Sequence, residues 1–130
     1  MRIKLTSIMV DDQSKALRFY TEVLGFVPKK NIPVGEYRWL TVASPEAPDD
    51  SELSLEPNAN PAGRAFQEAM LAQGIPVAAF EVADLAKEAE RLQAAGVVFT
   101  QMPTQMGPVS IAVCSDTCGN LIQLYQPPAR

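Results

Sequence analysis

The sequence predicts an α+β fold made of two βαβββ modules, and three observations lead to it. The first is a strand followed by a helix near the N-terminus, at residues 3–10 and 13–24, with apolar side chains on both faces of the strand and along one face of the helix. The second is the glycine that ends this helix, Gly25, where a left-handed residue is favoured. The third is that the order strand, helix, three strands recurs in the second half of the chain, which indicates an internal duplication.

The helix of each module has a capping residue, and each module continues with three strands. Asp12 or Ser14 can cap the first helix, and Asp84 the helix of the second half. The other elements of the first half are expected at residues 26–30 (strand), 31–35 (a Pro/Gly turn), 37–43 (strand) and 51–56 (strand). Those of the second half are expected at residues 75–82 (strand), 85–95 (helix), 97–100 (strand), 102–108 (loop), 109–115 (strand) and 121–125 (strand). The chain is therefore expected to be a single domain, residues 1–130, in which modules 1–58 and 75–130 are joined by a helical linker, residues 59–74.

Alternation along the strands predicts which side chains line a ligand-binding cup. If Leu53 and Leu55 pack on a helix, Glu52, Ser54 and Glu56 face the opposite way. The same argument places these residues on the cup side: Leu5, Ser7, Met9, Trp39, Thr41, Val77, Ala79, Glu81, Ser110, Ala112, Cys114, Leu121, Gln123 and Tyr125. The sheet is thus expected to be cup-shaped, with the helices outside and a small-molecule pocket inside.

The composition excludes several classes of function. The chain has no histidine, which rules out imidazole bases and the commonest transition-metal ligand. A net charge of −4 without a basic cluster argues against nucleic acid and permits a neutral or cationic ligand. No apolar run approaches the roughly 20 residues that span a membrane, and no export signal is visible, so we expect a cytoplasmic protein without membrane partners. Cys114 and Cys118 are expected to be reduced thiols, with Cys118 the more exposed.

The first strand and helix also resemble a known family. A strand ending in V-D-D at residues 10–12, then a helix ending in F-Y-T-E-V-L-G-F at residues 19–26, is similar to the opening module of the vicinal-oxygen-chelate superfamily. That superfamily includes glyoxalase I, extradiol dioxygenases, bleomycin-resistance proteins and fosfomycin-resistance proteins. The resemblance covers nearly the whole chain, and it implies paired βαβββ modules and a homodimer that completes the pocket.

The resemblance also points to four metal-ligand positions, one on the first and one on the last strand of each module. In this chain they fall on Leu5, Glu52, Val77 and Gln123. Two of these side chains are aliphatic, so a cation would bind weakly and we expect no metal cofactor. The alternative is a divalent ion such as Mg²⁺, Mn²⁺, Ni²⁺ or Zn²⁺ completed by Glu56, Glu81 or substrate oxygens.

Two residues at the predicted site have alternative interpretations. Glu52 would be desolvated among Leu5, Val77 and Gln123, which should raise its pKa and make it the candidate general base. Alternatively, it is a structural carboxyl group satisfied by Gln123 and a hydroxyl. Trp39 is either a stacking platform for a planar or cationic ligand or a plain core residue.

Two functions therefore remain open. One is a metal-free protein that binds a small molecule in the cup, similar in layout to the bleomycin-resistance proteins, with Leu5, Ser7, Trp39, Glu52, Val77, Ser110, Gln123 and Tyr125 as ligand-binding residues. The other is a glyoxalase-like lyase or isomerase that uses Glu52 as a base with or without a divalent metal. An extradiol dioxygenase is a distant third, because the iron site of that class resembles two histidines and a carboxylate.

Overall fold

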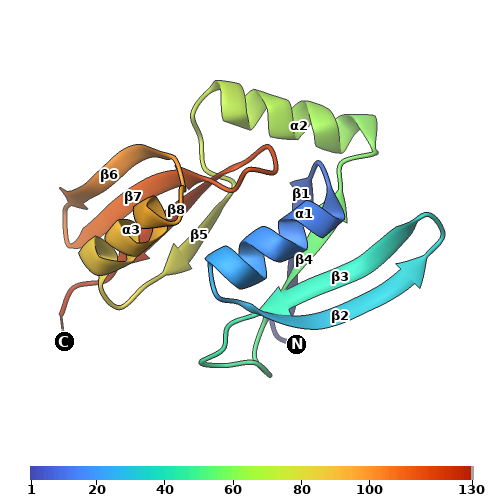
Figure 1. Cartoon of the computed structure of the whole chain (residues 1–130), viewed down its shortest axis with the longest axis horizontal. Coiled ribbons are helices and arrows are strands. Elements are labelled where there is room, and N and C mark those ends of the chain that lie inside the picture. The colour runs from blue at the N-terminus through green and yellow to red at the C-terminus, as the bar shows by residue number, and fades with distance from the viewer. Residues whose placement is uncertain (130) are drawn as a thin grey trace. The chain divides into compact units, whose positions relative to one another are not determined.

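Two four-stranded sheets carry the fold in the computed structural model, which describes residues 1–129 (Figure 1). The strand order is β1-β4-β3-β2 in one sheet and β5-β8-β7-β6 in the other. Both sheets are mixed, because β1 pairs with β4 and β5 with β8 in parallel, while the remaining neighbours are antiparallel. With three α-helices, this arrangement confirms the predicted α+β fold of two βαβββ modules.

The chain divides into two compact units between Glu68 and Ala69. In the first half the elements are β1 (Leu5–Val10), α1 (Gln13–Arg18), the π-helical turn η1 (Phe19–Val23), β2 (Val27–Val34), β3 (Tyr37–Ala43) and β4 (Glu52–Pro57). They are followed by α2 (Pro61–Ala72), β5 (Ala78–Glu81), α3 (Leu85–Ala94), β6 (Phe99–Met106), β7 (Val109–Ser115) and β8 (Leu121–Gln126). The division falls inside α2, which lies within the residues 59–74 that were expected to link the modules. None of the helices formed by residues 1–129 is long and apolar enough to span a membrane.

The N-terminal ends of α1 and α3 are stabilised in the same way. Asp12 accepts a hydrogen bond from the backbone N–H of Lys15 at 3.0 Å, and Asp84 accepts one from Lys87 at 3.1 Å. A side-chain oxygen at the N-cap satisfies one of the backbone donors that an α-helix leaves unpaired. Asp12 is therefore the cap of the first helix, and Ser14 instead accepts a hydrogen bond from Arg38.

The two predicted loops at residues 31–35 and 102–108 are largely strand, so those predictions were wrong. β2 continues through Pro33 to Val34, and β6 continues through Pro103 to Met106. Both are edge strands, where the missing N–H of proline can face the open side of the sheet without breaking a ladder. The turns themselves are short and are built on Gly35 and Gly107, each with a φ of 62°.

Each unit has its core between a helix and one face of its sheet. In the first unit α1 packs on β3 and β4, and Figure 1 shows it lying across those strands. In the second unit α3 packs on β6, β7 and β8. The fully or nearly fully buried side chains include Val10, Ala16, Tyr20, Leu40, Val42 and Leu55 in the first unit and Leu85, Leu92, Ala112, Cys114, Ile122 and Leu124 in the second.

Gln13 joins α1 to the end of the sheet where β3 and β4 stop pairing. Its amide nitrogen donates to the carbonyl oxygens of Arg38 at 2.7 Å and Leu55 at 2.9 Å, and its amide oxygen accepts from the N–H of Arg38 at 3.1 Å. The β3–β4 ladder covers only residues 41–43 and 52–54, so this amide supplies bonds that the ladder does not. One buried side chain thus holds a helix and two strands together.

We expect Gln13→Leu to lower the free energy of unfolding by about 1–3 kcal/mol, because it leaves buried backbone groups without partners while preserving side-chain volume. Urea denaturation followed by circular dichroism measures this change. Gln73→Leu, at an exposed position near the end of α2, is the matched control and should change stability by less than about 0.5 kcal/mol. Equal effects of the two substitutions would contradict the proposed link.

Candidate functional site

The face of the first sheet opposite α1 carries the candidate site. The parallel register pairs Leu5 with Glu52 and Ser7 with Ser54, and the antiparallel register pairs Thr41 with Ser54. Residues that pair directly share a face of the sheet, so these side chains lie together as the alternation predicted. Trp39 lies two residues before Thr41 on β3 and therefore belongs to the same face.

Glu52 is a buried carboxylate on this face, with 9% of the residue exposed. Both of its carboxylate oxygens accept hydrogen bonds from the Lys30 ammonium group at 2.8 Å, and Oε1 also accepts one from the Thr41 hydroxyl at 2.6 Å. The Thr41 oxygen in turn accepts from the backbone N–H of Lys30 at 3.1 Å. The carboxylate is thus satisfied by a lysine from β2 and a hydroxyl from β3.

The environment of Glu52 lowers its pKa below the ordinary value of 4.5. The hydrogen bonds from Lys30 and then Thr41 are the largest causes, and they outweigh the opposing effect of burial. The prediction that desolvation raises this pKa was therefore wrong. It failed because sequence alternation could not show that a lysine from β2 reaches the carboxylate.

Lys30 also links the carboxylate to the aromatic residue of the site. Its Nζ atom lies 5.0 Å from the centre of the Trp39 ring, within the range of a cation–π interaction. Trp39 is 40% exposed, so it is not a core residue. Sequence reasoning missed Lys30 because β2 has a register shift between Pro28 and Lys30, which alternation does not reveal. After this shift Lys30 pairs with Thr41 and Ile32 with Trp39.

The predicted metal-ligand positions offer few donors. Leu5 and Val77 have none, and Leu5 is 48% exposed. The ammonium group of Lys30 already occupies the position beside Glu52 that a cation would need. Among residues 1–129, no group of three or more Cys, Asp and Glu side chains is arranged to hold a metal ion. This donor set does not fit the four-ligand site of the metal-dependent proteins.

The strand registers also allow the two modules to be compared position by position. The helix caps Asp12 and Asp84 are 72 positions apart, which places Leu5 opposite Val77 in the repeat. Leu5 pairs with Glu52, and Val77 donates its backbone N–H to Leu121 at 3.0 Å. By this register the repeat partner of Glu52 is Leu121, and that of Gln123 is Ser54. The resemblance had placed Glu52 and Gln123 at equivalent positions of the two modules. The strand registers show that these positions are not equivalent.

The second sheet differs from the first on its corresponding face. Gln123 pairs with Ala79 and with Val113, and Tyr125 pairs with Glu81 and with Ile111. The side chains on this face are therefore those of Ala79, Glu81, Ile111, Val113, Ser115, Leu121, Gln123 and Tyr125. Lys30, Trp39 and Glu52 of the first unit correspond here to Gln101, Ile111 and Leu121. The aromatic ring with its ion pair thus belongs to the first unit only.

The prediction that Ser110 shares a face with Gln123 was wrong. Ser110 pairs with Gln126, and Ala112 and Cys114 pair with the core residues Leu124 and Ile122. Strand β7 has apolar residues on both faces, so its alternation did not reveal its orientation. The Ser110 hydroxyl donates to the side-chain oxygen of Gln105 at 2.9 Å.

Neither cysteine is placed as an accessible nucleophile. Cys114 is fully buried, and burial followed by the nearby Asp116 raises its pKa to about 11. Cys118 was predicted to be the more exposed thiol, but it is also fully buried. It is held inside the β7–β8 turn, where Asp116 accepts hydrogen bonds from the backbone of Cys118 and from Asn120.

We expect Glu52→Gln to destabilise the protein by an amount that is constant from about pH 5 to 7 and fades only as the pH falls below about 4.5. The sign follows from the lowered pKa: the folded state favours the ionised carboxylate, so its stabilising effect is present above the unfolded pKa and is lost as the pH falls through the folded pKa. Unfolding free energies of both proteins across this range measure it. A difference that already fades near pH 6 would instead indicate a raised pKa.

Comparisons with known proteins agree with this architecture. A family model named Glyoxalase/Bleomycin resistance protein/Dioxygenase superfamily matches residues 2–124. The chain is 52% identical over 126 residues to YurT of Bacillus subtilis (strain 168), covering 97% of this chain and 99% of YurT. Among solved structures it is similar to UcmS2, with a TM-score of 0.83, 33% identity and coverage of 96% of this chain and 97% of UcmS2. It is also similar to TnmS3, an antibiotic binding protein from Streptomyces sp. CB03234, with a TM-score of 0.77, 30% identity and coverage of 98% and 96%.

Proposed function

Because the chain belongs to the Glyoxalase/Bleomycin resistance protein/Dioxygenase superfamily, we propose that it binds a small planar molecule on Trp39 without changing it chemically and without a metal ion. The observation that carries this proposal is the state of Glu52. Both of its oxygens are engaged by Lys30, and Thr41 engages one of them as well. The site thus presents an open indole beside a carboxylate that is already paired.

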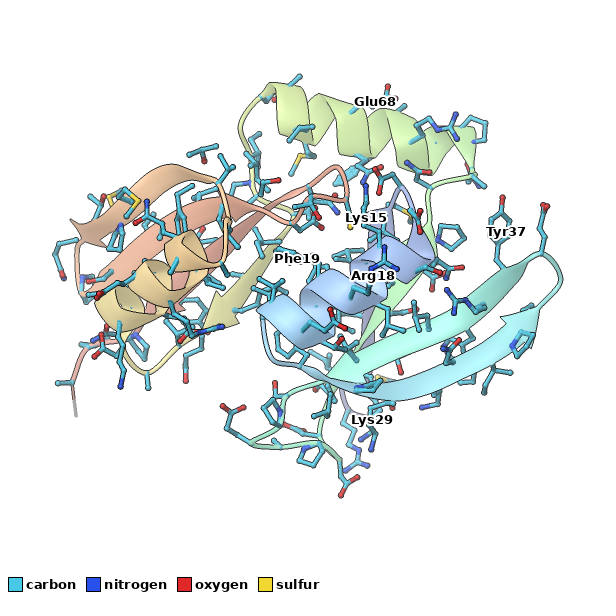
Figure 2. The ribbon with its side chains drawn as sticks, in the orientation of Figure 1. Lys15, Arg18, Phe19, Lys29, Tyr37 and Glu68 are labelled. Atoms are coloured by element: carbon cyan, nitrogen blue, oxygen red, sulfur yellow. The ribbon has the colours of Figure 1, made fainter. Side chains whose placement is uncertain are left out.

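The indole of Trp39 supplies the binding surface. It is the only tryptophan of the chain, it is 40% exposed, and Lys30 holds one side of it through a cation–π contact. A large aromatic side chain that is fixed before binding provides contact area at little entropic cost. Exposed apolar side chains on neighbouring positions, Ile32 and Tyr37, extend this surface along β2 and β3. Figure 2 shows Tyr37 beside the turn that joins these strands.

Antibiotics are the ligand class that one relative of known structure, TnmS3, suggests. TnmS3 is an antibiotic binding protein, and it is similar to this chain over nearly its full length. Many antibiotics contain a planar aromatic ring, which matches the stacking surface of Trp39. We therefore propose sequestration of such a compound as the function of the site.

Catalysis of the lyase or isomerase type is the weaker alternative. It would need Glu52 to accept a proton from a substrate. The lowered pKa makes this carboxylate a weak base, and a substrate would first have to displace Lys30. No other carboxylate on this face has a comparable position, since Glu56 accepts a hydrogen bond from the Ser54 hydroxyl at 2.7 Å.

Binding of aromatic antibiotics tests the proposal. We expect at least one member of a panel that includes nalidixic acid and bleomycin to bind saturably, and Trp39→Ala to weaken that binding at least about tenfold. Isothermal titration calorimetry gives the affinities, and mass spectrometry should recover the compound unchanged. Phe66→Ala, which removes an exposed aromatic side chain on α2, is the matched control and should retain the affinity. Binding that survives Trp39→Ala, or a compound that is chemically altered, would contradict the proposal.

Divalent metal ions should neither accompany the protein nor stabilise it. We expect metal analysis of untagged protein to find no stoichiometric ion, and thermal-shift titrations with Mg²⁺, Mn²⁺, Ni²⁺, Zn²⁺ and Co²⁺ to give no saturable rise in Tm. The physical reason is that Leu5 and Val77 supply no ligand atom and Lys30 neutralises Glu52. A saturable rise with one of these ions would return the metal-dependent lyase to first place.

A further inference from the structure

We propose that the ligand which stacks on Trp39 carries a negative charge at its edge, as a planar aromatic carboxylate or phenolate, and that Lys30 selects for that charge. This inference rests on the proposed function, because it concerns the ligand of the same site. It differs from the expectation drawn from net charge alone, which permitted a neutral or cationic ligand. The ammonium group of Lys30 is held in place beside Trp39 by the carboxylate of Glu52.

The ammonium group has a donor left over. A lysine ammonium has three N–H donors, and in the described part of the chain two of them are used by the carboxylate oxygens of Glu52. Nζ lies 2.8 Å from each of those oxygens and 5.0 Å from the centre of the Trp39 ring. A planar molecule that contacts the indole on the side where Nζ lies therefore also meets a charged donor that is already in position.

The position of the Lys30 ammonium group is also fixed before a ligand binds. Lys30 is held at its head by Glu52 and at its backbone by Thr41, so binding a ligand oxygen requires little further loss of side-chain freedom. Its side chain remains 32% exposed, whereas that of Glu52 is 10% exposed. The surface offered to a ligand beside the indole is thus the cation and not its carboxylate partner.

A positively charged ligand is disfavoured at this site. The cation–π interaction of Trp39 is already made by Lys30, and a second positive charge would lie near the first. Glu56, on the same sheet face, is the acidic group that would oppose an anion. It is only half-buried, and one of its oxygens accepts from Ser54, so solvent and this hydrogen bond both weaken its effect on the site.

Three probes with one ring system separate charge from stacking. Naphthoate, naphthalenemethanol and naphthylmethylammonium present the same aromatic surface with a negative, zero and positive charge. We expect naphthoate to bind about tenfold more tightly than the alcohol, the gain of one charge-assisted hydrogen bond, and the ammonium compound to bind most weakly. Isothermal titration calorimetry at low and high salt measures the order, and added salt should reduce the advantage of naphthoate.

Substitution of Lys30 identifies the source of the preference. Lys30→Met keeps the aliphatic stem and removes the charge, so naphthoate should lose its advantage over the alcohol when both are measured on this variant. The double variant Lys30→Met with Glu52→Gln avoids leaving a carboxylate without its partner, and it should show the same loss. Lys30→Arg keeps the charge and should retain the preference for naphthoate.

The outcomes separate this inference from the proposed function. If no probe binds in a way that Trp39→Ala abolishes, the proposed function fails and this inference with it. If the probes bind through Trp39 but the ammonium compound binds as tightly as naphthoate, or the preference survives the double variant, only the selection by Lys30 is overturned.

Discussion

The bidentate ion pair between Lys30 and Glu52 is the interaction on which the first sheet face depends. A carboxylate with so little exposure must be paired or hydrogen-bonded, because an unpaired buried charge is strongly destabilising. Here the partner comes from β2, two strands away from β4, and it crosses above Thr41 on β3. The pair therefore ties three strands together, places a cation over Trp39 and lowers the pKa of Glu52 in a single arrangement.

The two modules use the same backbone plan for different surfaces. Repeat positions that hold Lys30, Trp39 and Glu52 in the first sheet hold Gln101, Ile111 and Leu121 in the second. The parallel pairing of first and last strands and the aspartate caps of α1 and α3 are common to both. What is shared lies in the strand pairing and the helix caps, and the three residues compared here differ on the sheet face opposite the helix. The repeated backbone plan thus accounts for the fold of both modules. The different residues on one sheet face account for the aromatic ring and ion pair found in the first module.

Most of the fold could be predicted from local signals, because caps, glycine stops and strand alternation are written within a few neighbouring residues. The extent of β2 and β6 could not, since whether Pro33 and Pro103 interrupt a strand depends on whether that strand lies at a sheet edge. Lys30 was missed for another reason: a register shift between Pro28 and Lys30 decides that Lys30 pairs with Thr41, and alternation within the strand does not reveal such a shift. The face of Ser110 was predicted wrongly because β7 has apolar residues on both faces. Its sequence therefore does not show which face is turned toward the helix.

The carboxylate of Glu52 is engaged by a cation that belongs to the chain itself. A cation beside Glu52 can be a metal ion or an ammonium group, and each satisfies the same charge; in this chain Lys30 fills that role covalently tethered to the sheet. An ammonium group cannot polarise a substrate by coordination, but it can donate hydrogen bonds and hold an aromatic ring in place. The same electrostatic requirement that serves catalysis in a metal-dependent site is compatible with recognition here. A lysine beside Glu52 therefore supports the proposed binding role better than catalysis by this carboxylate.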